Sequence, residues 1–491
     1  MMGVRRKGLG VRGVGTLGFF GIAIVLLASV VAGCAGELAL GDPRTMTFKP
    51  VEFSPPDPER IVLDNGMVVY LLEDHELPLI TMTATMRTGS WLDPADKIGL
   101  AALTGSVMRT GGGGGFSAEE VDEALEQFAG DVSIGIGRQS GSASLDVLSK
   151  DLKRGLQIFA ALVRTPAFEP ARLELAKLQA IEGIRRRQDN PGSIVGREFI
   201  KLLYGAEHPT ARESSIDSVR RITRDDLVAF HRNTIHPNAI ILGVTGDFKK
   251  EEMLASLREV FGDWKKGAIP ELKIADVPER DAEKPAVRFV DKDTTQTHLR
   301  VGHLSIKEND PDYVPLAIAN DILGGSSFRS RIFNDVRTKL GLAYSVGSRL
   351  NTGVHDQGIW LVRAETKLAS TQEVIERFLV NIERMRSEPV SDVELAEAKD
   401  AYINSFIFSF SSPSVIVSRL IELEYDGLPK DFLQQLRDKV VKLTKEDILA
   451  AAKKHLHPDR LKIVAVGSGK TLPAVLSTFG EVKEIKLSPE G

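Results

Sequence analysis

The sequence is poor in the residues that form disulfides and metal clusters. Its 491 residues include one cysteine, Cys34, and nine histidines. A single cysteine excludes a disulfide within the chain. The pairs His231/His236 and His298/His303 are each five residues apart, a spacing that places the two rings on different faces of a helix or strand. We therefore expect no zinc site built from these pairs.

The chain also lacks a strong excess of either charge. It has 63 Lys and Arg against 67 Asp and Glu, which gives a net charge of −4. Without a basic face there is no general attraction to nucleic acid, so we expect no nucleic-acid partner. The hydrophobic share of 42% is that of a soluble globular protein. The length exceeds what one core supports, so two or more domains are expected.

The longest uncharged run of the chain lies at its N-terminus. Four basic residues fall within the first 12, and residues 13–33 carry no charge and are rich in Phe, Ile, Leu and Val. A basic start followed by an apolar run is typical of an export signal. The run ends in Val31-Ala32-Gly33 directly before Cys34, which resembles a bacterial lipoprotein signal, whose cysteine becomes the lipid-modified first residue.

Two fates remain open for this segment. Cleavage before Cys34 would remove four positive charges and no negative ones, changing the net charge from −4 to −8. A lipoprotein cysteine carries more than one acyl chain, which is enough for stable attachment to a membrane. Alternatively, the 21-residue run stays as a transmembrane anchor, because it is long enough to span. Both predict an exported protein of the bacterial cell envelope, in the periplasm.

The body of the chain contains an internal repeat. Residues 222–246 and 443–467 align without a gap at an offset of 221, and each has a Thr-x-x-Asp start, a His-Pro pair and an apolar run. Thr-x-x-Asp is a capping box that begins a helix, and His-Pro ends one, so each copy predicts a helix followed by a strand. Residues 191–197 also match 413–419, at an offset of 222. Together these matches indicate duplication of a whole domain.

The fold class follows from the order of the predicted elements. A hairpin is predicted around Asn65-Gly66 and a strand at 79–86, whereas helical patterns dominate 99–129 and 148–187. This segregation predicts an α+β fold of two homologous domains, each an antiparallel sheet packed with helices. We expect a signal at 1–33, a flexible tether at 34–58, an N-terminal domain at 59–266, a linker at 267–285 and a C-terminal domain at 286–490.

Residues 87–101 carry a specific resemblance. They read Arg-Thr-Gly-Ser-Trp-Leu-Asp-Pro-Ala-Asp-Lys-Ile-Gly-Leu-Ala, which is similar to the approach to the zinc motif of the insulinase, pitrilysin and mitochondrial processing peptidase superfamily. There a helix continues with His-x-x-Glu-His, in which the histidines bind zinc and the glutamate is the general base. The resemblance places Ala102 and Ser106 at the histidine positions and Gly105 at the glutamate position. None of the three supports zinc catalysis.

The family's third zinc ligand is a glutamate on a later helix that ends before an Asp-x-Pro turn. Counting back from Asp189-Asn190-Pro191 places Gly183 there, with Glu182 adjacent but turned by about 100° on the helix. The resemblance therefore implies that this chain has no metal cofactor of its own. Zinc is expected in a partner subunit.

The second half matches another family signature, in residues 320–333 and 336–346. In the family, an arginine and a tyrosine seven residues later hold the substrate backbone and stabilise the oxyanion. Arg337 and Tyr344 have that spacing. The structural alternative is that Arg337 pairs with an acid such as Asp335 and that Tyr344 fills the core.

The resemblance implies a non-catalytic, substrate-binding subunit of a heterodimeric zinc metallopeptidase. Small members of the superfamily often work as two-chain clamshells, so the expected partners are a zinc-bearing paralogous subunit, peptide substrates and, through the N-terminal lipid, a membrane. The enclosed peptide would add to a sheet edge by main-chain hydrogen bonds. The alternative is a catalytically dead scaffold or peptide-binding protein with no peptidase partner.

Overall fold

A computed structural model of the chain describes residues 56–271, 273–274, 276–277, 284–326, 328–408 and 410–488. The predicted signal and Cys34 lie outside the described residues, as does most of the tether. Among the helices of the described part, none combines the length and the apolar composition needed to cross a membrane.

The first half of the chain contains a sheet of six strands in the order β1-β2-β6-β3-β5-β4. Its strands are β1 (Glu59–Val62), β2 (Val68–Glu73), β3 (Leu79–Met86), β4 (Asp131–Ile136), β5 (Gly141–Leu148) and β6 (Ile240–Gly246). The hairpin predicted at Asn65-Gly66 joins β1 to β2, and the predicted strand 79–86 is β3. Gly66 has a φ of 82°, a left-handed conformation that favours glycine.

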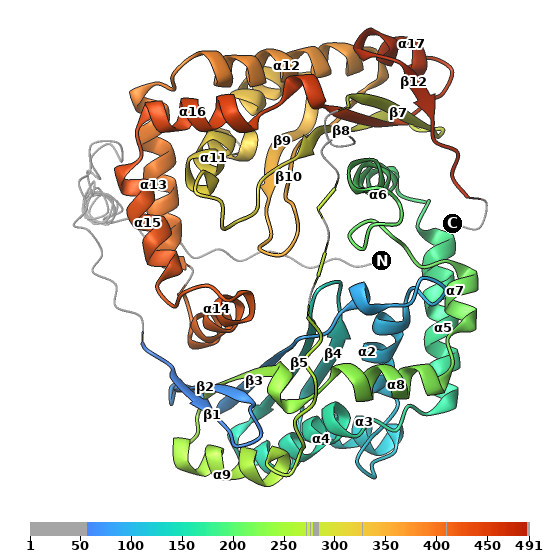
Figure 1. Ribbon diagram of the computed structural model, residues 1–491, viewed down its shortest axis with the longest axis vertical. Coiled ribbons are helices and arrows are strands. Elements are labelled where there is room, and N and C mark those ends of the chain that lie inside the picture. The colour runs from blue at the N-terminus through green and yellow to red at the C-terminus, as the bar shows by residue number, and fades with distance from the viewer. Residues whose placement is uncertain are drawn as a thin grey trace, which may run out of the picture. The chain divides into compact units, whose positions relative to one another are not determined.

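Helices cover one face of this sheet (Figure 1). They are α2 (Leu100–Thr110), α3 (Ala118–Gln127), α4 (Leu152–Arg164), α5 (Pro170–Arg186), α7 (Ile216–Arg221), α8 (Arg224–Thr234) and α9 (Lys250–Phe261). Alternate residues of β3, including Met82 and Met86, are fully buried in the core that these helices share with the sheet. The alternation follows from the two-residue period of a strand.

The second half repeats the arrangement with the sheet order β12-β7-β11-β8-β10-β9. Its strands are β7 (Ala286–Asp291), β8 (Gln296–Leu304), β9 (Ala343–Asn351), β10 (Ile359–Lys367), β11 (Lys462–Gly467) and β12 (Val482–Glu484). Its helices are α11 (Tyr313–Asn320), α12 (Thr371–Ser387), α13 (Asp392–Phe408), α14 (Pro413–Asp426), α15 (Phe432–Lys442), α16 (Lys445–His455) and α17 (Leu472–Leu476). Two π-helical segments, η5 (Asp321–Gly325) and η6 (Phe333–Lys339), lie between α11 and β9.

The predicted fold class, two related sheets each packed with helices, is confirmed. The strands are mainly antiparallel, but β2 pairs with β6 in parallel, and β7 pairs in parallel with β11 and β12. Each sheet is therefore mixed. Two neighbouring strands can run parallel only when a long connection, instead of a hairpin, joins them. The strands β6 and β11 each enter their sheet after such a long helical stretch.

The internal repeat is also confirmed. In the first copy α8 leads into β6, and in the second α16 leads into β11 at the same place in its sheet. Both helices begin with the predicted capping box: the backbone N–H of Asp226 donates to Thr223 Oγ1 at 3.3 Å, and that of Asp447 donates to Thr444 Oγ1 at 3.2 Å. One local sequence thus encodes the same helix-to-strand unit twice.

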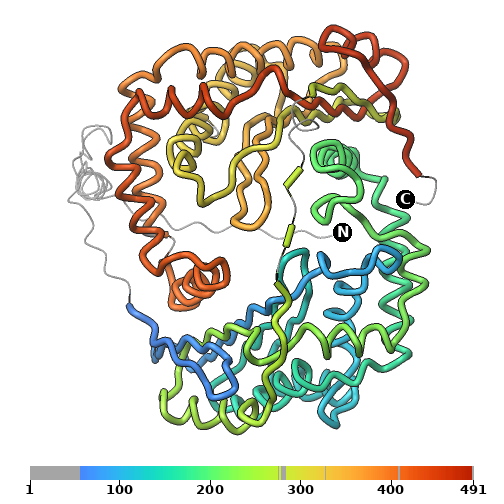
Figure 2. The backbone as a smooth tube through the Cα atoms, in the orientation of Figure 1, coloured from blue at the N-terminus to red at the C-terminus, as the bar shows by residue number. Residues whose placement is uncertain are grey.

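The two halves exchange one helix each. Helix α6 (Pro191–Tyr204) belongs to the first half in sequence, yet Val195 and Phe199 pack with Val464 and Val466 of β11. Figure 2 shows this green helix beside the strands of the second sheet. It covers part of the face that the second half's own helices leave open. The start of α6, residues 191–197, is the segment that matches the start of α14, residues 413–419, at an offset of 222.

Helix α14 makes the reciprocal contact with the first sheet. Its Val417 and Ile421 pack with Tyr70 and Ile241. A Cβ added to Gly243 of β6 would lie 2.3 Å from Val417 Cγ1, so only glycine allows α14 to approach so closely.

A polar group, the Glu424 cluster, fixes α14 in place. Arg60 of β1 donates to both carboxylate oxygens of Glu424, at 2.6 and 2.8 Å, and the Tyr70 hydroxyl donates to the same carboxylate. Arg87 donates to the carbonyl oxygens of Tyr425 and Glu424 at 2.8 and 3.1 Å. A bidentate guanidinium–carboxylate pair is a strong and directional contact.

Candidate functional site

Helix α2 carries the positions that the resemblance assigns to the zinc motif. It begins after Gly99, whose φ of 110° favours glycine. The Asp93 carboxylate accepts hydrogen bonds from the backbone N–H groups of Gly99 and Ala101 at 2.8 and 2.9 Å. Burial raises the pKa of Asp93 to about 6. The helix is thus anchored at its N-terminus by a buried carboxyl group, which satisfies otherwise unpaired N–H groups.

None of the four positions offers a good zinc donor. Ala102 and Ser106 are exposed on one side of α2, where one has no donor atom and the other has only a neutral hydroxyl. Gly183 is exposed on α5, which packs against α2. Zinc sites in proteins use thiolate, imidazole and carboxylate ligands, so these residues do not fit the metal.

Gly105 excludes a general base for a further reason. It is buried, and a Cβ added there would lie 2.6 Å from the backbone nitrogen of Ile136 and 3.0 Å from the carbonyl carbon of Gly135. Both atoms belong to backbone of β4, which cannot give way as a side chain can. A glutamate at this position would therefore force α2 away from the sheet.

Glu182, the carboxylate next to Gly183 in the sequence, is already engaged on its own helix. Its side chain accepts a hydrogen bond from Arg186 at 2.6 Å and lies 3.8 Å from Arg185. Such i,i+3 and i,i+4 pairs are ordinary features of an exposed helix surface. Glu182 therefore does not replace the missing ligand.

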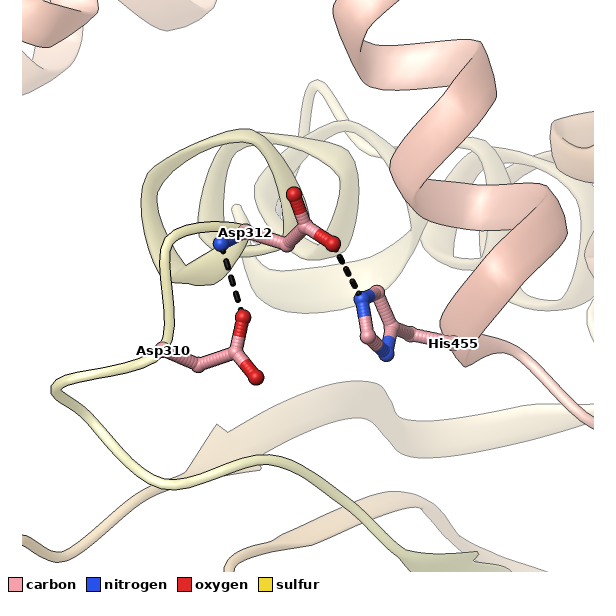
Figure 3. A group of neighbouring side chains, drawn as sticks. All are labelled: Asp310, Asp312 and His455. Carbon is pink, nitrogen blue, oxygen red and sulfur yellow. Dashed lines mark hydrogen bonds and ion pairs between the residues drawn. The ribbon is translucent and has the colours of Figure 1, made fainter.

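In the described part of the chain, one group of side chains has the composition of a metal site. Asp310, Asp312 and His455 offer ligand atoms within 4.8 Å of one another (Figure 3). However, Asp312 Oδ2 accepts from His455 Nε2 at 2.7 Å and from Lys454 Nζ at 2.6 Å, and these contacts lower its pKa. Asp310 Oδ1 accepts from the backbone N–H of Asp312 at 2.8 Å. The group joins the start of α11 to the end of α16, and we assign it a structural role.

The second candidate site depends on an irregularity in β9. Ser345 pairs with Glu365 of β10, but Ala343 pairs with Thr366, so Tyr344 is an extra residue between two successive pairs. Such a bulge redirects a side chain that strand alternation would send to the other face. Tyr344 is accordingly 79% exposed.

Arg337, in the π-helical segment η6, lies beside this tyrosine. Its guanidinium carbon is 4.6 Å from the centroid of the Tyr344 ring, 4.8 Å from that of Phe333 and 5.5 Å from that of Phe328. The two phenylalanine rings also contact each other edge to face, with 4.8 Å between centroids. We call these four residues the Arg337 cluster. Cation–π contacts on several sides hold the guanidinium in one place while leaving its N–H donors available.

Both structural alternatives for this pair are wrong. Asp335 is bound instead by Arg377, which donates to its two carboxylate oxygens at 2.7 and 2.8 Å, and by Asn381 at 2.8 Å. Within the described residues no ion pair involves Arg337, and Tyr344 lies outside the core. The structure brings Arg337 and Tyr344 together with their polar groups uncommitted.

Sequence reasoning missed the two phenylalanines of the cluster. Phe333 lies four residues before Arg337, a helical spacing that could have revealed the contact. Phe328 had no such signal, because it follows Gly324-Gly325-Ser326, where the chain leaves η5. Its 72% exposure and its contacts depend on the path of that turn.

Comparison with known proteins agrees with this geometry. Residues 221–402 match the family description "Peptidase M16 inactive domain". The chain is 26% identical over 372 residues to a protein of Mycobacterium leprae described as a zinc protease, which covers 73% of this chain and 81% of that protein. It is 24% identical over 407 residues to the non-peptidase homologue YmxG of Helicobacter pylori, which covers 81% of this chain and 91% of that protein.

Solved structures show the same fold. The peptidase M16 inactive domain from Pseudomonas fluorescens superposes with a TM-score of 0.76 at 26% identity, covering 84% of this chain and 98% of that one. A protease from Helicobacter pylori superposes with a TM-score of 0.74 at 18% identity, covering 84% and 99% of the two chains. The second likeness concerns the fold alone.

Proposed function

We propose that this chain is a member of the M16, or insulinase, peptidase family and that it acts as a non-catalytic, substrate-binding subunit of a heterodimeric zinc peptidase. In this role it encloses a peptide together with a zinc-bearing paralogue. The observation that carries the proposal is a contrast within one chain. The zinc-motif positions offer no suitable ligand, whereas Arg337 and Tyr344 meet at the surface with free donors.

The zinc-motif positions support the negative half of the proposal. Ala102, Ser106 and Gly183 supply no zinc ligand, and the space at Gly105 is filled by the backbone of β4. The matches to a domain described as inactive and to a non-peptidase homologue favour a chain without a catalytic zinc of its own.

The Arg337 cluster supports the positive half. A guanidinium presents five N–H donors in a fixed plane, and a tyrosine hydroxyl adds one more. A peptide carbonyl gains negative charge when it is attacked, so donors already held in place stabilise the transition state more than the ground state. Phe328 and Phe333 limit the motion of the Arg337 side chain, which reduces the entropy lost on binding.

Peptide hydrolysis and zinc content, measured on the full chain alone and mixed with a paralogue that has an intact His-x-x-Glu-His, test the proposal. We expect no zinc and no cleavage by this chain alone, and cleavage on mixing that Arg337→Ala lowers about 10²-fold or more. Chelator-sensitive cleavage by this chain alone would contradict the proposal. Activity of the paralogue that is independent of this chain would also contradict it.

A second candidate is a catalytically dead scaffold or peptide-binding protein with no peptidase partner. The close contact of Gly105 with β4 favours it, because this half is adapted to tight packing where the family places a base. Under this hypothesis Arg337 and Tyr344 bind peptide or are relics. Peptide binding that survives without any paralogue, with no hydrolysis on mixing, would favour this candidate.

We also propose that Cys34 is lipid-modified and holds the protein at a membrane of the bacterial envelope. The small residues directly before the only cysteine support this proposal. Metabolic labelling with a fatty acid should mark the wild-type chain and leave Cys34→Ser unlabelled. Labelling of Cys34→Ser, or an unlabelled wild-type chain, would overturn the lipoprotein assignment, and the latter would favour a retained transmembrane anchor.

A further inference from the structure

Four arginines occupy one face of the second sheet. In β8, Leu299 and Val301 belong to the core under the sheet's own helices, so Arg300 lies on the opposite face. The same alternation places Arg363 of β10 and Arg288 of β7 on that face, beside residues that pack with α6. Arg349 of β9 also lies on that face, because Val346, three residues earlier, faces the helices and successive side chains of a strand alternate between the two faces.

The strand register brings these side chains into one group. Arg363 is directly opposite Arg300, and Arg300 and Arg288 flank Val464 of β11 on its two sides. Arg349 is opposite Leu361, two residues before Arg363, and therefore lies diagonal to it. Residues directly opposite on neighbouring strands have Cβ atoms about 5 Å apart, and like charges in such positions are destabilising. Arg288, Arg300, Arg349 and Arg363 together form what we call the arginine face.

Acidic partners for this group are scarce. Among the described residues, no ion pair joins any of the four guanidinium groups to a carboxylate. Glu365 lies on the same face two residues after Arg363, in the neighbouring row directly opposite His298, with 3.7 Å between His298 Nδ1 and Glu365 Oε1. Desolvation by burial and the nearby Arg363 and Arg349 lower the pKa of Arg300, and the charge of Glu365 opposes this shift only in part.

The arginine face remains partly open. Arg349 and Arg363 are exposed, and Arg288 and Arg300 are half-buried. Helix α6 covers this side of the sheet over β11 and β8, whereas β9 is an edge strand and carries Tyr344 at its start. The exposed arginines therefore share strands β9 and β10 with the bulge that presents Tyr344.

We propose that the arginine face binds acidic side chains of an extended peptide. Guanidinium groups bind carboxylates by paired, charge-assisted hydrogen bonds, and several on neighbouring strands match the spacing of an extended chain. Binding of carboxylates would also relieve the repulsion between Arg300 and Arg363. The proposal deepens the substrate-binding role proposed above, because it names the class of peptide, but it does not require a peptidase partner.

The test measures binding of labelled peptides to the full chain without a paralogue. Three peptides of equal length alternate alanine with glutamate, glutamine or lysine. We expect the glutamate peptide alone to bind, and we expect Arg363→Ser to weaken it about tenfold or more. Arg363→Lys should restore part of the loss, because it keeps the charge but not the planar fork. Arg384→Ser, at an exposed position of α12 paired with Glu388, is the matched control and should bind as the wild type does.

A second readout separates binding from a structural role. Without peptide, Arg363→Ser should slightly raise the melting temperature because it removes a like-charge neighbour of Arg300, whereas a structural arginine would lower it. Equal binding of the three peptides, or an unchanged affinity in Arg363→Ser, would overturn the proposal. So would binding of inorganic polyphosphate in preference to the glutamate peptide.

The outcome is independent of the proposed subunit role. Retained binding of the glutamate peptide with no hydrolysis on mixing with the paralogue would reject the subunit and keep the arginine face. Hydrolysis on mixing, with no preference for acidic peptides, would reject the arginine face alone.

Discussion

The two sheets share one topology but differ in the side chains on the face away from their own helices. In the first sheet, the row that contains Gly243 also contains Tyr70, Thr83, Ser144 and Ser133. In the second sheet, the equivalent row contains Val464, Arg288, Arg300, Arg363 and Gly347. Thr83 and Ser144 thus stand where the second sheet has Arg300 and Arg363, and Tyr70 stands where it has Arg288.

This difference shows which part of the duplicated unit is constrained. The helix-covered faces of both sheets are apolar and alternate with a period of two, because they must form a core. The opposite faces are only partly covered by the exchanged helices α6 and α14, so their chemistry can diverge without loss of the fold. We therefore expect peptide binding on the sheet faces turned away from the helices, where the two halves differ in their side chains.

A second comparison concerns the contact between a helix and the edge strand. Gly105 of α2 approaches β4, and Gly324 of η5 approaches β9, where an added Cβ would lie 2.7 Å from the backbone nitrogen of Ser348. Both halves thus use glycine for a close approach of helix and strand. The helix with the zinc-motif positions thus packs against its edge strand in the same way as the π-helical segment η5 of the second half packs against β9.

The largest expected effect is on the Arg337 cluster of the second half. In the mixture with a zinc-bearing paralogue, Arg337→Ala should lower kcat/KM by about 10²-fold or more, the typical cost of removing one oxyanion donor. The kcat/KM of Arg337→Lys should lie between those of wild type and Arg337→Ala, because lysine keeps the positive charge but lacks the planar guanidinium fork. Hydrolysis rates check this, with Arg384→Ala as the control. A rate equal to wild type in Arg337→Ala would remove the functional distinction between the halves.

Restoring a glutamate tests the packing of the first half. Gly105→Glu should lower the free energy of unfolding by about 3 kcal/mol or more, because a buried charge and a new side chain meet the backbone of β4. Gly183→Glu, at an open and exposed helix position, should be near neutral or slightly stabilising. Urea denaturation measures both. Equal stabilities would mean that α2 moves freely relative to β4.

The Glu424 cluster tests how firmly the halves are joined. Glu424→Ala leaves Arg60 and Tyr70 without their shared carboxylate and should cost about 1.5–3 kcal/mol. Glu422→Ala, in the same helix but bound only to Arg419 at its surface, is the matched control and should cost under about 1 kcal/mol. Thermal unfolding distinguishes them. A similar loss in both variants would mean that α14 is held by its apolar contacts alone.

The same cluster predicts a pH dependence. The hydrogen bond from Arg60 lowers the pKa of Glu424 below its ordinary value, so the folded state favours the charged carboxylate. This stabilisation is fully present above pH values near the unfolded pKa and is lost as the pH falls through the lower, folded pKa. Wild type should therefore lose more stability than Glu424→Gln on acidification below about pH 4. Parallel pH profiles would contradict this assignment.

The smallest effect compares the two repeated helix starts. Thr223→Ala and Thr444→Ala each remove a capping hydroxyl and should each lower the free energy of unfolding by about 1 kcal/mol. The double variant should lose about the sum, because the two caps are in different halves. Chemical denaturation checks this. Unequal losses of unfolding free energy would show that the helix of only one repeat depends on its capping box.

Much of the fold could be predicted because its signals are local. The capping boxes at Thr223 and Thr444, the turn at Asn65-Gly66 and the apolar alternation of residues 79–86 each act within a few residues. The spacing of Arg337 and Tyr344 was likewise visible as a resemblance. The parallel pairing of β2 with β6 was not, because it joins strands separated by the whole helical part of the first half.

The sequence by itself determined the internal repeat, the elements with strong local signals and the lack of zinc donors at Ala102, Gly105, Ser106 and Gly183, since these depend only on residue type and spacing. Only the tertiary structure decided that α6 and α14 exchange sheets, that a bulge exposes Tyr344 to Arg337, and that four arginines from four strands share one face. Such features arise from strand register and long-range packing. Both are set by the burial of the whole core, so no short segment encodes them.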